Sequence, residues 1–270
     1  MSSGYSWFNE LDDYVYSIPK YGINYNDIEK IKNLATASYN IIMFINEVLF
    51  KKGSYTKSKY PVVLENPEKL YDYTDKEMKL IIQHMIEKIK TSKNKDVNKK
   101  INGIINGRLK KMINDLNSTF KQLMKLLDES EKKLKFGFHE LVVMDDGEVD
   151  YFVNYSELRI NILHDITILV GKICHEGLYI GVLLIDLYFL RRFLDKDYIT
   201  NGIIYTGASH SLNYIDILTK EFGFKITHAS YSKYPMNKIN DKLNENLRSL
   251  FWPPVFDQCS DMGSFPELFK

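Results

Sequence analysis

The chain has 270 residues, of which 44% are hydrophobic and 26% are charged, and this composition excludes wholesale disorder and fibrous repeats. Its 36 basic residues against 35 acidic ones leave a net charge of +1, so charge gives no reason to expect nucleic acid or a membrane surface as the main partner. The two cysteines, Cys174 and Cys259, exclude a disulfide framework and indicate a reducing compartment. We therefore expect an intracellular protein.

No signal peptide or transmembrane segment is expected from the hydropathy pattern. The N-terminus continues directly into polar and aromatic residues, without a basic stretch followed by an apolar one. The longest apolar region, 166–190, is interrupted by charged or polar side chains such as Lys172 and Asp186. A membrane-spanning helix needs about 20 mostly apolar residues, and the uninterrupted run 177–185 is less than half that length.

The first half of the chain is expected to be mainly helical. Residues 1–24 are rich in aromatic side chains and are expected to be irregular, and residues 53–73 form a loop that holds a candidate strand at Val62–Leu64. Apolar residues at steps of three and four predict helices over about 27–52 and 97–127. Between them, the capping-box pattern Thr74-Asp75-Lys76-Glu77 predicts a helix over 75–89.

The last of these helices motivates an expectation about association. It spans 31 residues, about 46 Å at about 1.5 Å per residue, and its apolar positions continue to Leu127. The 75–89 helix is half as long and covers about half of that stripe, so residues 75–127 are expected to project as a helical hairpin. The rest of the stripe is expected to meet the N-terminal helix, a second copy of the chain or a protein partner, so we predict association through the 75–127 helices.

The second half of the chain adds strand signals to the helices. Residues 136–144 and 148–153 flank Asp145-Asp146-Gly147, which is a strong hairpin signal. Further on, the chain is expected to form the following elements: helices over 156–175 and 178–194, a strand over 202–206, a helix over 212–222, a strand over 224–229 and a helix over 239–250.

The order strand, glycine loop, helix, glycine turn, strand at 202–229 predicts a βαβ unit and hence a parallel sheet. The expected fold is therefore α/β and rich in helix, or α+β, with a small mixed sheet around this unit. Two parts are expected, a helical part over 1–135 and an α/β part over 136–270, or one integrated domain that contains both.

His210 is the strongest candidate for chemistry. It ends the loop Gly207-Ala208-Ser209-His210 at the carboxyl end of the expected 202–206 strand, where ligands of open α/β sheets bind. A histidine there can bind a divalent metal or transfer protons, with Gly207 and Ser209 contributing to a cofactor site. In the alternative reading Ser209 or Ser211 caps a helix and His210 is simply exposed.

Asp186 is the second candidate, because it lies inside the apolar run 182–190, where an unpaired carboxylate is costly. It can orient a histidine, as carboxylates behind metal ligands do, or pair with Arg191 or Arg192. His164 and His175 fall on a polar stripe that is typical of a surface helix. The cofactor stays open, with a divalent metal as the only candidate.

Two resemblances follow from these segments. The run Asp186-Leu-Tyr-Phe-Leu-Arg-Arg-Phe and the run that begins at Ile203 resemble uncharacterised proteins of mimivirus-like giant viruses. The excess of 31 Lys over 5 Arg and of 29 Ile over 4 Ala agrees with the AT-rich genome of such a source. The GxxH of Gly207 and His210 resembles the C-terminal motif of the TraB/ChaN/Tiki group, which includes metal-dependent hydrolases; the N-terminal GxxH-type loop of that group is absent here.

Two functional hypotheses therefore stand side by side. The first is a non-enzymatic interaction or virion-associated protein on a degenerate hydrolase-like scaffold, in the host cytoplasm or the virion. The alternative is a metal-dependent hydrolase that binds its metal through His210, with Asp186 as the orienting carboxylate and Tyr205 or Ser209 nearby.

Overall fold

The computed structural model describes residues 3–20, 22–50, 75–136, 142–143, 149–150, 155–196, 198 and 201–253. Nearly all of this part of the chain outside its C-terminal region is helical. The elements are α1 (Ser3–Ser17), α2 (Tyr25–Phe50), α3 (Asp75–Lys90), α4 (Lys95–Ile104), the π-helical turn η2 (Ile105–Leu109), α5 (Lys110–Phe136), β1 (Val142–Val143), β2 (Val149–Asp150), α6 (Tyr155–Leu194), α7 (Ala208–Lys220), α8 (Met236–Ile239), the 3-10 turn η3 (Asn240–Lys242) and α9 (Leu247–Phe251).

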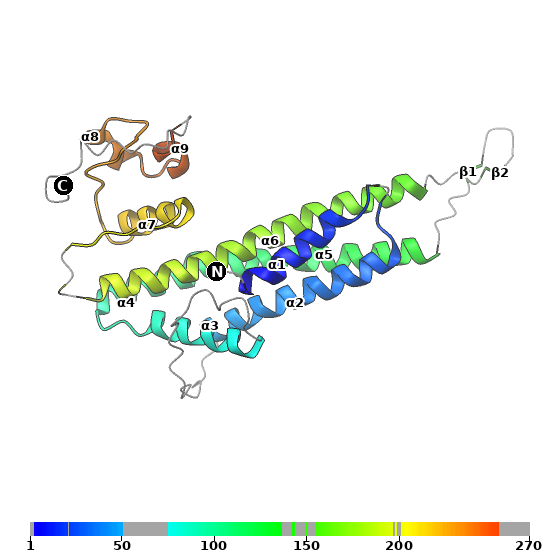
Figure 1. Ribbon diagram of the computed structural model, residues 1–270, viewed down its shortest axis with the longest axis horizontal. Helices are drawn as coiled ribbons and strands as arrows, with labels where there is room; N and C mark the ends of the chain where they lie inside the picture. Colours follow the sequence, from blue (N-terminus) through cyan, green and yellow to red (C-terminus); the bar gives the residue numbers. More distant parts are fainter. Residues whose placement is uncertain are drawn as a thin grey trace.

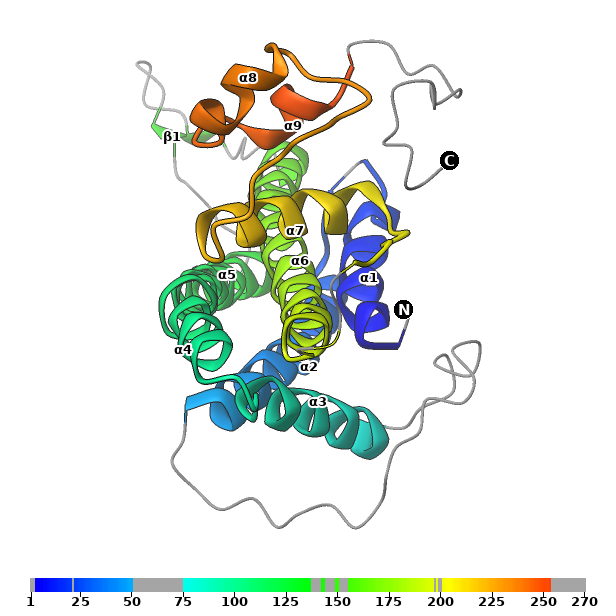
Figure 2. The same cartoon turned by 90° about the vertical axis from the view of Figure 1, so that its left-hand side faces the viewer.

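The three longest helices, α2, α5 and α6, lie along the long axis of the molecule as an elongated bundle, and α1 runs beside α6 (Figure 1). Viewed from one end, α6 runs through the middle of the bundle and the other helices surround it (Figure 2). It contacts α1, α3, α4, α5 and α7. Apolar side chains at helical spacing along α6, including Ile166, Val170 and Leu187, are completely buried. Its burial by neighbours on several sides explains why this helix is apolar around much of its circumference.

The expected helices of the first half are confirmed at 25–50, 75–90 and 95–136, where the last forms from α4, η2 and α5 in succession. Its apolar stripe is covered inside the chain, since Leu116, Leu123 and Leu127 are fully buried and α5 packs against α2 and α6. The reason for expecting an uncovered stripe is therefore removed. Association through the 75–127 helices stays a prediction.

The expectation of an α/β fold with a sheet is wrong: the protein is helical. Among the described residues the only strands are β1 and β2, of two residues each, which pair antiparallel with Val142 opposite Asp150 and Val143 opposite Val149. That pairing is the expected hairpin in its shortest form, and its turn lies outside the described residues, as does the candidate strand Val62–Leu64. The parallel sheet and the βαβ unit are absent from the described part of the chain.

The helix of the expected βαβ unit does form, as α7, but its flanking segments do not become strands. Residues 201–206 and 224–229 run without a turn or a bend, as their β-branched and aromatic side chains favour, yet neither forms a ladder with another described segment. A strand needs a hydrogen-bonded neighbour, and β propensity alone does not supply one. The expectation of a parallel sheet therefore rested on the β propensity of these residues alone.

Three further expectations need correction. Residues 3–17, expected to be irregular, form α1, which packs against α2 and α6. The helices expected at 156–175 and 178–194 are one continuous helix, α6. The helix expected at 239–250 is replaced by the short elements α8, η3 and α9. The boundary at residue 135 stays a prediction, although α1, α5 and α6 share one hydrophobic core across it.

By length and composition alone, α6 is the one described helix that could cross a membrane. The core helix of a soluble bundle passes the same test, and α6 contacts five other helices in this fold. The length and composition of α6 are therefore only weak evidence of a membrane span.

Gly177 lets α1 lie close to α6. A Cβ atom at this position would collide with the ring of Phe8, which is buried at the contact. The same contact includes a hydrogen bond of 3.2 Å from the Cys174 thiol to the backbone oxygen of Phe8. Burial raises the pKa of that thiol to about 12, so it stays protonated and can donate.

We expect Gly177→Ala and Gly181→Ala to have opposite effects on the free energy of unfolding. A Cβ at Gly181 meets nothing within 4 Å, so alanine there should stabilise α6 by about 0.5–1 kcal/mol through helix propensity. At Gly177 the same gain is opposed by an overpacking cost of about 1–3 kcal/mol. Urea denaturation of both variants measures the difference, and equal effects would contradict the close approach of α1.

Candidate functional site

The candidate site lies where α7 crosses the C-terminal half of α6. Asp186 is on α6 and its side chain is fully buried, facing the helix that follows in the chain. His210, Asn213 and Tyr214 occupy positions i, i+3 and i+4 of α7, which places their side chains on one face. That face is turned toward Asp186.

The carboxylate of Asp186 is bound through both of its oxygens. His210 Nδ1 lies 2.6 Å from Oδ1, and the Asn213 side-chain amide donates to Oδ2 at 2.9 Å. The Tyr214 side chain also lies close enough to Asp186 to affect its ionisation. A buried carboxylate with this many donors is stably placed, because each donor compensates part of its lost hydration.

Burial and hydrogen bonding act in opposite directions on Asp186. Burial is the larger effect and raises the pKa of its carboxyl group, while the hydrogen bonds from His210 and Asn213 partly offset that rise. Burial also raises the pKa of Tyr214, and the nearby Asp186 charge adds to this effect. The phenol is therefore a hydrogen-bond donor at neutral pH.

A second group of polar side chains extends the site toward the long helix. Arg108 lies in η2 and pairs with Asp216 of α7 at 2.8 Å. Its other terminal nitrogen lies 3.4 Å from the side-chain oxygen of Asn213, whose amide nitrogen binds Asp186. Lys220 also pairs with Asp216, at 2.6 Å. The π turn thus carries the arginine that joins α5 to α7, and such turns often lie at functional positions.

The structure brings together the two residues on which the sequence argument relied most, Asp186 and His210. The alternative partners of Asp186 are engaged elsewhere: Arg191 pairs with Asp195 at 3.3 Å and Arg192 lies 3.5 Å from the Tyr188 hydroxyl. Of the alternatives left open for Asp186, the contact with a histidine is therefore the one that the structure shows. Its role in catalysis or metal binding stays a prediction.

The remaining predicted site residues do not join this pair. Gly207 is the N-cap of α7, its backbone oxygen accepts from Ser211 N at 3.0 Å, and no side chain caps the helix. Ser209 is exposed on the first turn. Tyr205 is fully exposed on the segment before α7, so its ring points away from Asp186.

Three residues of this site were not predicted from the sequence: Asn213, Tyr214 and Arg108. Asn213 and Tyr214 follow His210 by three and four residues, and this helical spacing was the available signal. Arg108 gave no such signal, because it is more than 100 residues away from α7 in the chain. His164 and His175 are exposed, and within the described ranges no three His, Cys, Asp or Glu side chains are grouped as metal ligands.

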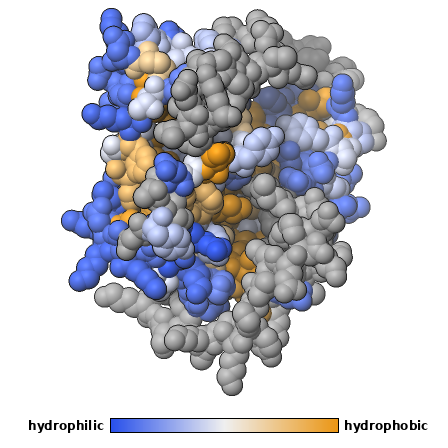
Figure 3. Space-filling model, turned by 60° about the vertical axis from the view of Figure 1, so that its left-hand side comes forward, coloured by the Kyte–Doolittle hydropathy of each residue, from blue (hydrophilic) through white to orange (hydrophobic). Residues whose placement is uncertain are grey.

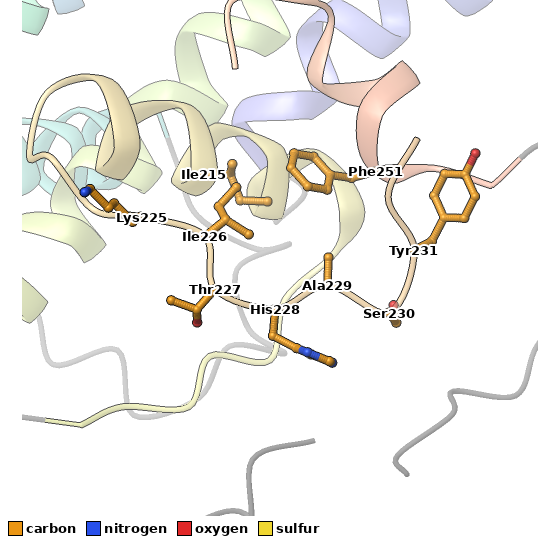
Figure 4. Close-up of a pocket in the computed structure, with 9 residues that line it drawn as sticks. All are labelled: Ile215, Lys225, Ile226, Thr227, His228, Ala229, Ser230, Tyr231 and Phe251. Atoms are coloured by element: carbon orange, nitrogen blue, oxygen red, sulfur yellow. The ribbon is translucent and has the colours of Figure 1, made fainter. Parts of the chain in front are cut away.

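A separate hollow of about 460 Å³ lies along residues 225–231. Figure 4 shows Ile215 of α7, Ile226 and Phe251 of α9 facing one another at its wall, with the His228 ring pointing away from them. The backbone of Ile226 is held by Asn240, whose side-chain amide donates to its oxygen and accepts from its nitrogen, both at 2.8 Å. One edge of this extended segment is therefore paired by a side chain instead of a strand.

The fold and the site define a helical bundle whose central helix carries a buried, fully bonded carboxylate. Residues 9–270 match the family described as a family of unknown function (DUF5847), and the chain belongs to that family. It is 36% identical to uncharacterized protein R706 of Acanthamoeba polyphaga mimivirus, over 93% of this chain and 60% of that protein. It is also 33% identical to uncharacterized protein R161 of the same virus, over 89% of this chain and 60% of that protein.

These comparisons confirm the resemblance to uncharacterised proteins of giant viruses. The chain spans about 60% of the length of these two relatives. A third mimivirus protein, R160, is 58% identical over 32% of this chain. No solved structure matches the chain significantly.

The resemblance to the TraB/ChaN/Tiki group has no support. The chain matches another family, and the relatives reported above are uncharacterised mimivirus proteins. The GxxH motif also lacks the β-strand that precedes it in the TraB/ChaN/Tiki group, since residues 201–206 before Gly207 form no strand. The GxxH is explained locally: glycine caps α7, and His210 on the first turn reaches Asp186. The degenerate hydrolase-like scaffold is therefore withdrawn.

Proposed function

We propose that this protein is a non-enzymatic interaction protein of a giant virus, which binds a protein partner through the segments on either side of α7. The observation that carries this proposal is the exposure of large apolar side chains on those segments. Ile203 is 83% exposed, Tyr205 is fully exposed and Phe224 is 47% exposed. Exposed apolar residues of this size are typical of protein-binding surfaces.

The surface is held in place by the residues described above. Asp186 binds His210 and Asn213 of α7, and both segments continue directly from the ends of that helix. Both oxygens of the buried Asp186 carboxylate are bound by side chains of α7, so these bonds fix α7 on the bundle. Figure 3, which turns the α7–α9 end of the molecule forward, shows apolar surface between hydrophilic side chains.

Site-specific photocross-linking tests the proposal. A photoreactive amino acid replaces Tyr205 in one variant and Lys121, which is exposed on α5, in a matched control. Both proteins are mixed with proteins extracted from purified virions. We expect a discrete adduct from position 205, its loss when Ile203→Glu is added, and no adduct from position 121. Equal labelling from both positions, or an adduct that survives Ile203→Glu, would contradict the proposal.

A metal-dependent hydrolase is the second candidate, supported by one observation. His210 is bonded through Nδ1 to a buried carboxylate, the arrangement that fixes the other ring nitrogen for metal binding or proton transfer. Titration with manganese and zinc, followed by calorimetry of His210→Ala, tests this reading. It requires a bound metal in the original protein that the variant loses, whereas the interaction proposal expects the same metal stoichiometry in both.

A further inference from the structure

A second hollow, of about 680 Å³, lies at the C-terminal end of α6. Its walls are aromatic and come from both helices: Tyr188, Phe189 and Phe193 from α6 and Tyr214 from α7. Arg192 and Lys196 line the same hollow. Its volume is within the range of pockets that bind small molecules, about 300–1,000 Å³.

The aromatic walls form a connected set of rings. Phe189 and Phe193 stack with their ring centroids 6.1 Å apart, one helical turn from each other. Phe189 also contacts Tyr214, at 5.1 Å between centroids. Tyr214 is in turn buried between the two helices, with 8% of its surface exposed. A planar ring entering this hollow would therefore meet aromatic faces that are already fixed, which lowers the entropic cost of stacking.

The charged side chains of this hollow are of one sign. The Arg192 guanidinium lies 5.7 Å from the ring centroid of Tyr188, and Lys196 Nζ lies 5.4 Å from that of Tyr198. Among the described residues that line the hollow there is no carboxylate, and neither cation has an ion-pair partner in the described part of the chain.

Asp195, which follows the last residue of α6, is engaged by residues outside this hollow. Its carboxylate accepts hydrogen bonds from the Ser92 hydroxyl and the Asn94 backbone N–H, each at 2.7 Å, and pairs with Arg191. Burial opposes its charge, but these bonds outweigh burial and lower its pKa to about 2. Asp195 is thus ionised, and its described partners include neither Arg192 nor Lys196.

We propose that this hollow binds a planar aromatic anion of the nucleoside phosphate class. The base would stack on the Phe189, Phe193 and Tyr214 rings, and the phosphate would bind Arg192 and Lys196 at the rim. Arginine presents a fork of N–H donors that matches phosphate oxygens, and aromatic side chains stack on any base without selecting its sequence. The combination of stacking walls with unpaired cations distinguishes this hollow from the one along 225–231.

Calorimetric titration of the full chain with three probes separates the two parts of the proposed ligand. Adenosine monophosphate carries ring and charge, adenosine carries the ring alone, and inorganic phosphate carries the charge alone. We expect one bound adenosine monophosphate per chain, with affinity that falls as salt rises. Adenosine and phosphate should each bind at least about tenfold more weakly.

Paired charge variants locate the site. Arg192→Gln with Lys196→Gln should weaken binding of adenosine monophosphate by at least about tenfold. The matched control is Lys111→Gln with Lys121→Gln, which removes the same charge from exposed positions on α5 and should leave the affinity unchanged. Absence of binding at millimolar nucleotide, equal affinity for adenosine, or equal losses in both double variants would overturn the proposal.

Discussion

Replacing Asp186 by leucine is expected to lower the free energy of unfolding by about 2–4 kcal/mol. The substitution removes the acceptor from His210 Nδ1 and from the Asn213 amide, and Asn213 is itself buried. A buried donor left without an acceptor loses its hydration without compensation. The loss should appear first in α7, because these bonds join α7 to α6. Hydrogen exchange should therefore show faster exchange of the α7 amides than in the original protein.

Asp216→Asn is the matched control for that variant. Its carboxylate also binds side chains, Arg108 and Lys220, but it is partly exposed to solvent. Solvent screens such pairs, and we expect a loss of less than about 1 kcal/mol. Comparable losses for Asp186→Leu and Asp216→Asn in urea denaturation would mean that the buried carboxylate does not hold α7.

A triple variant separates a structural role of this cluster from a chemical one. Replacing Asp186, His210 and Asn213 together by apolar residues removes the donors along with their acceptor. Such replacements of buried polar clusters are often neutral or stabilising. If the cluster only fixes α7, the triple variant should recover much of the stability lost by Asp186→Leu and retain cross-linking from position 205.

The contact between Asp186 and His210 could be predicted because burial of a carboxylate demands a partner. Asp186 lies in a long apolar run, so its environment followed from the sequence, and a histidine 24 residues later was available to pair with it. The identity of the remaining partners did not follow. Arg108 reaches α7 because a π turn rotates it toward that helix, and such a turn leaves no sequence pattern comparable to a cap or a glycine motif.

The error in fold class has a specific origin in residues 202–206 and 224–229. These runs of β-branched and aromatic residues have the composition of buried parallel strands, but composition does not specify a ladder partner. At Ile226 the backbone donor and acceptor are both bound by Asn240, a side chain 14 residues away. The sequence does not distinguish an asparagine whose side chain binds the backbone of an extended segment from one that caps a helix.

The helices were easier to predict, and the exceptions again depend on tertiary contacts. The hydrophobic period identified α2 and α5, and a capping box identified α3. The central helix is apolar on several sides, so its pattern has no clear period, and it was predicted as two helices instead of one. The turn between α1 and α2 depends on Gly22. The sequence does not show this, because the reason is the contact of Gly22 with Arg159 of α6.

Gly22→Ala is expected to be the most destabilising glycine substitution in the described part of the chain, at about 2–5 kcal/mol. Gly22 has φ of +103°, a conformation that side chains disfavour. A Cβ there would also lie 2.5 Å from the Cβ and 2.7 Å from the backbone carbon of Arg159 on α6. Backbone cannot move aside as a flexible side chain can, so α1 and α6 would have to separate at this end of the bundle.

Gly223→Ala isolates the conformational part of that loss. Gly223 has φ of +71° at the end of α7, and a Cβ there meets nothing within 4 Å, so the expected loss is about 1 kcal/mol. The excess loss in Gly22→Ala should come from the contact with Arg159, whose Nε donates to the backbone oxygen of Ile23 at 2.7 Å. Thermal and urea denaturation of both variants measure this difference. Equal losses would show that the α1–α2 turn does not rest on α6, because backbone conformation alone would then account for both.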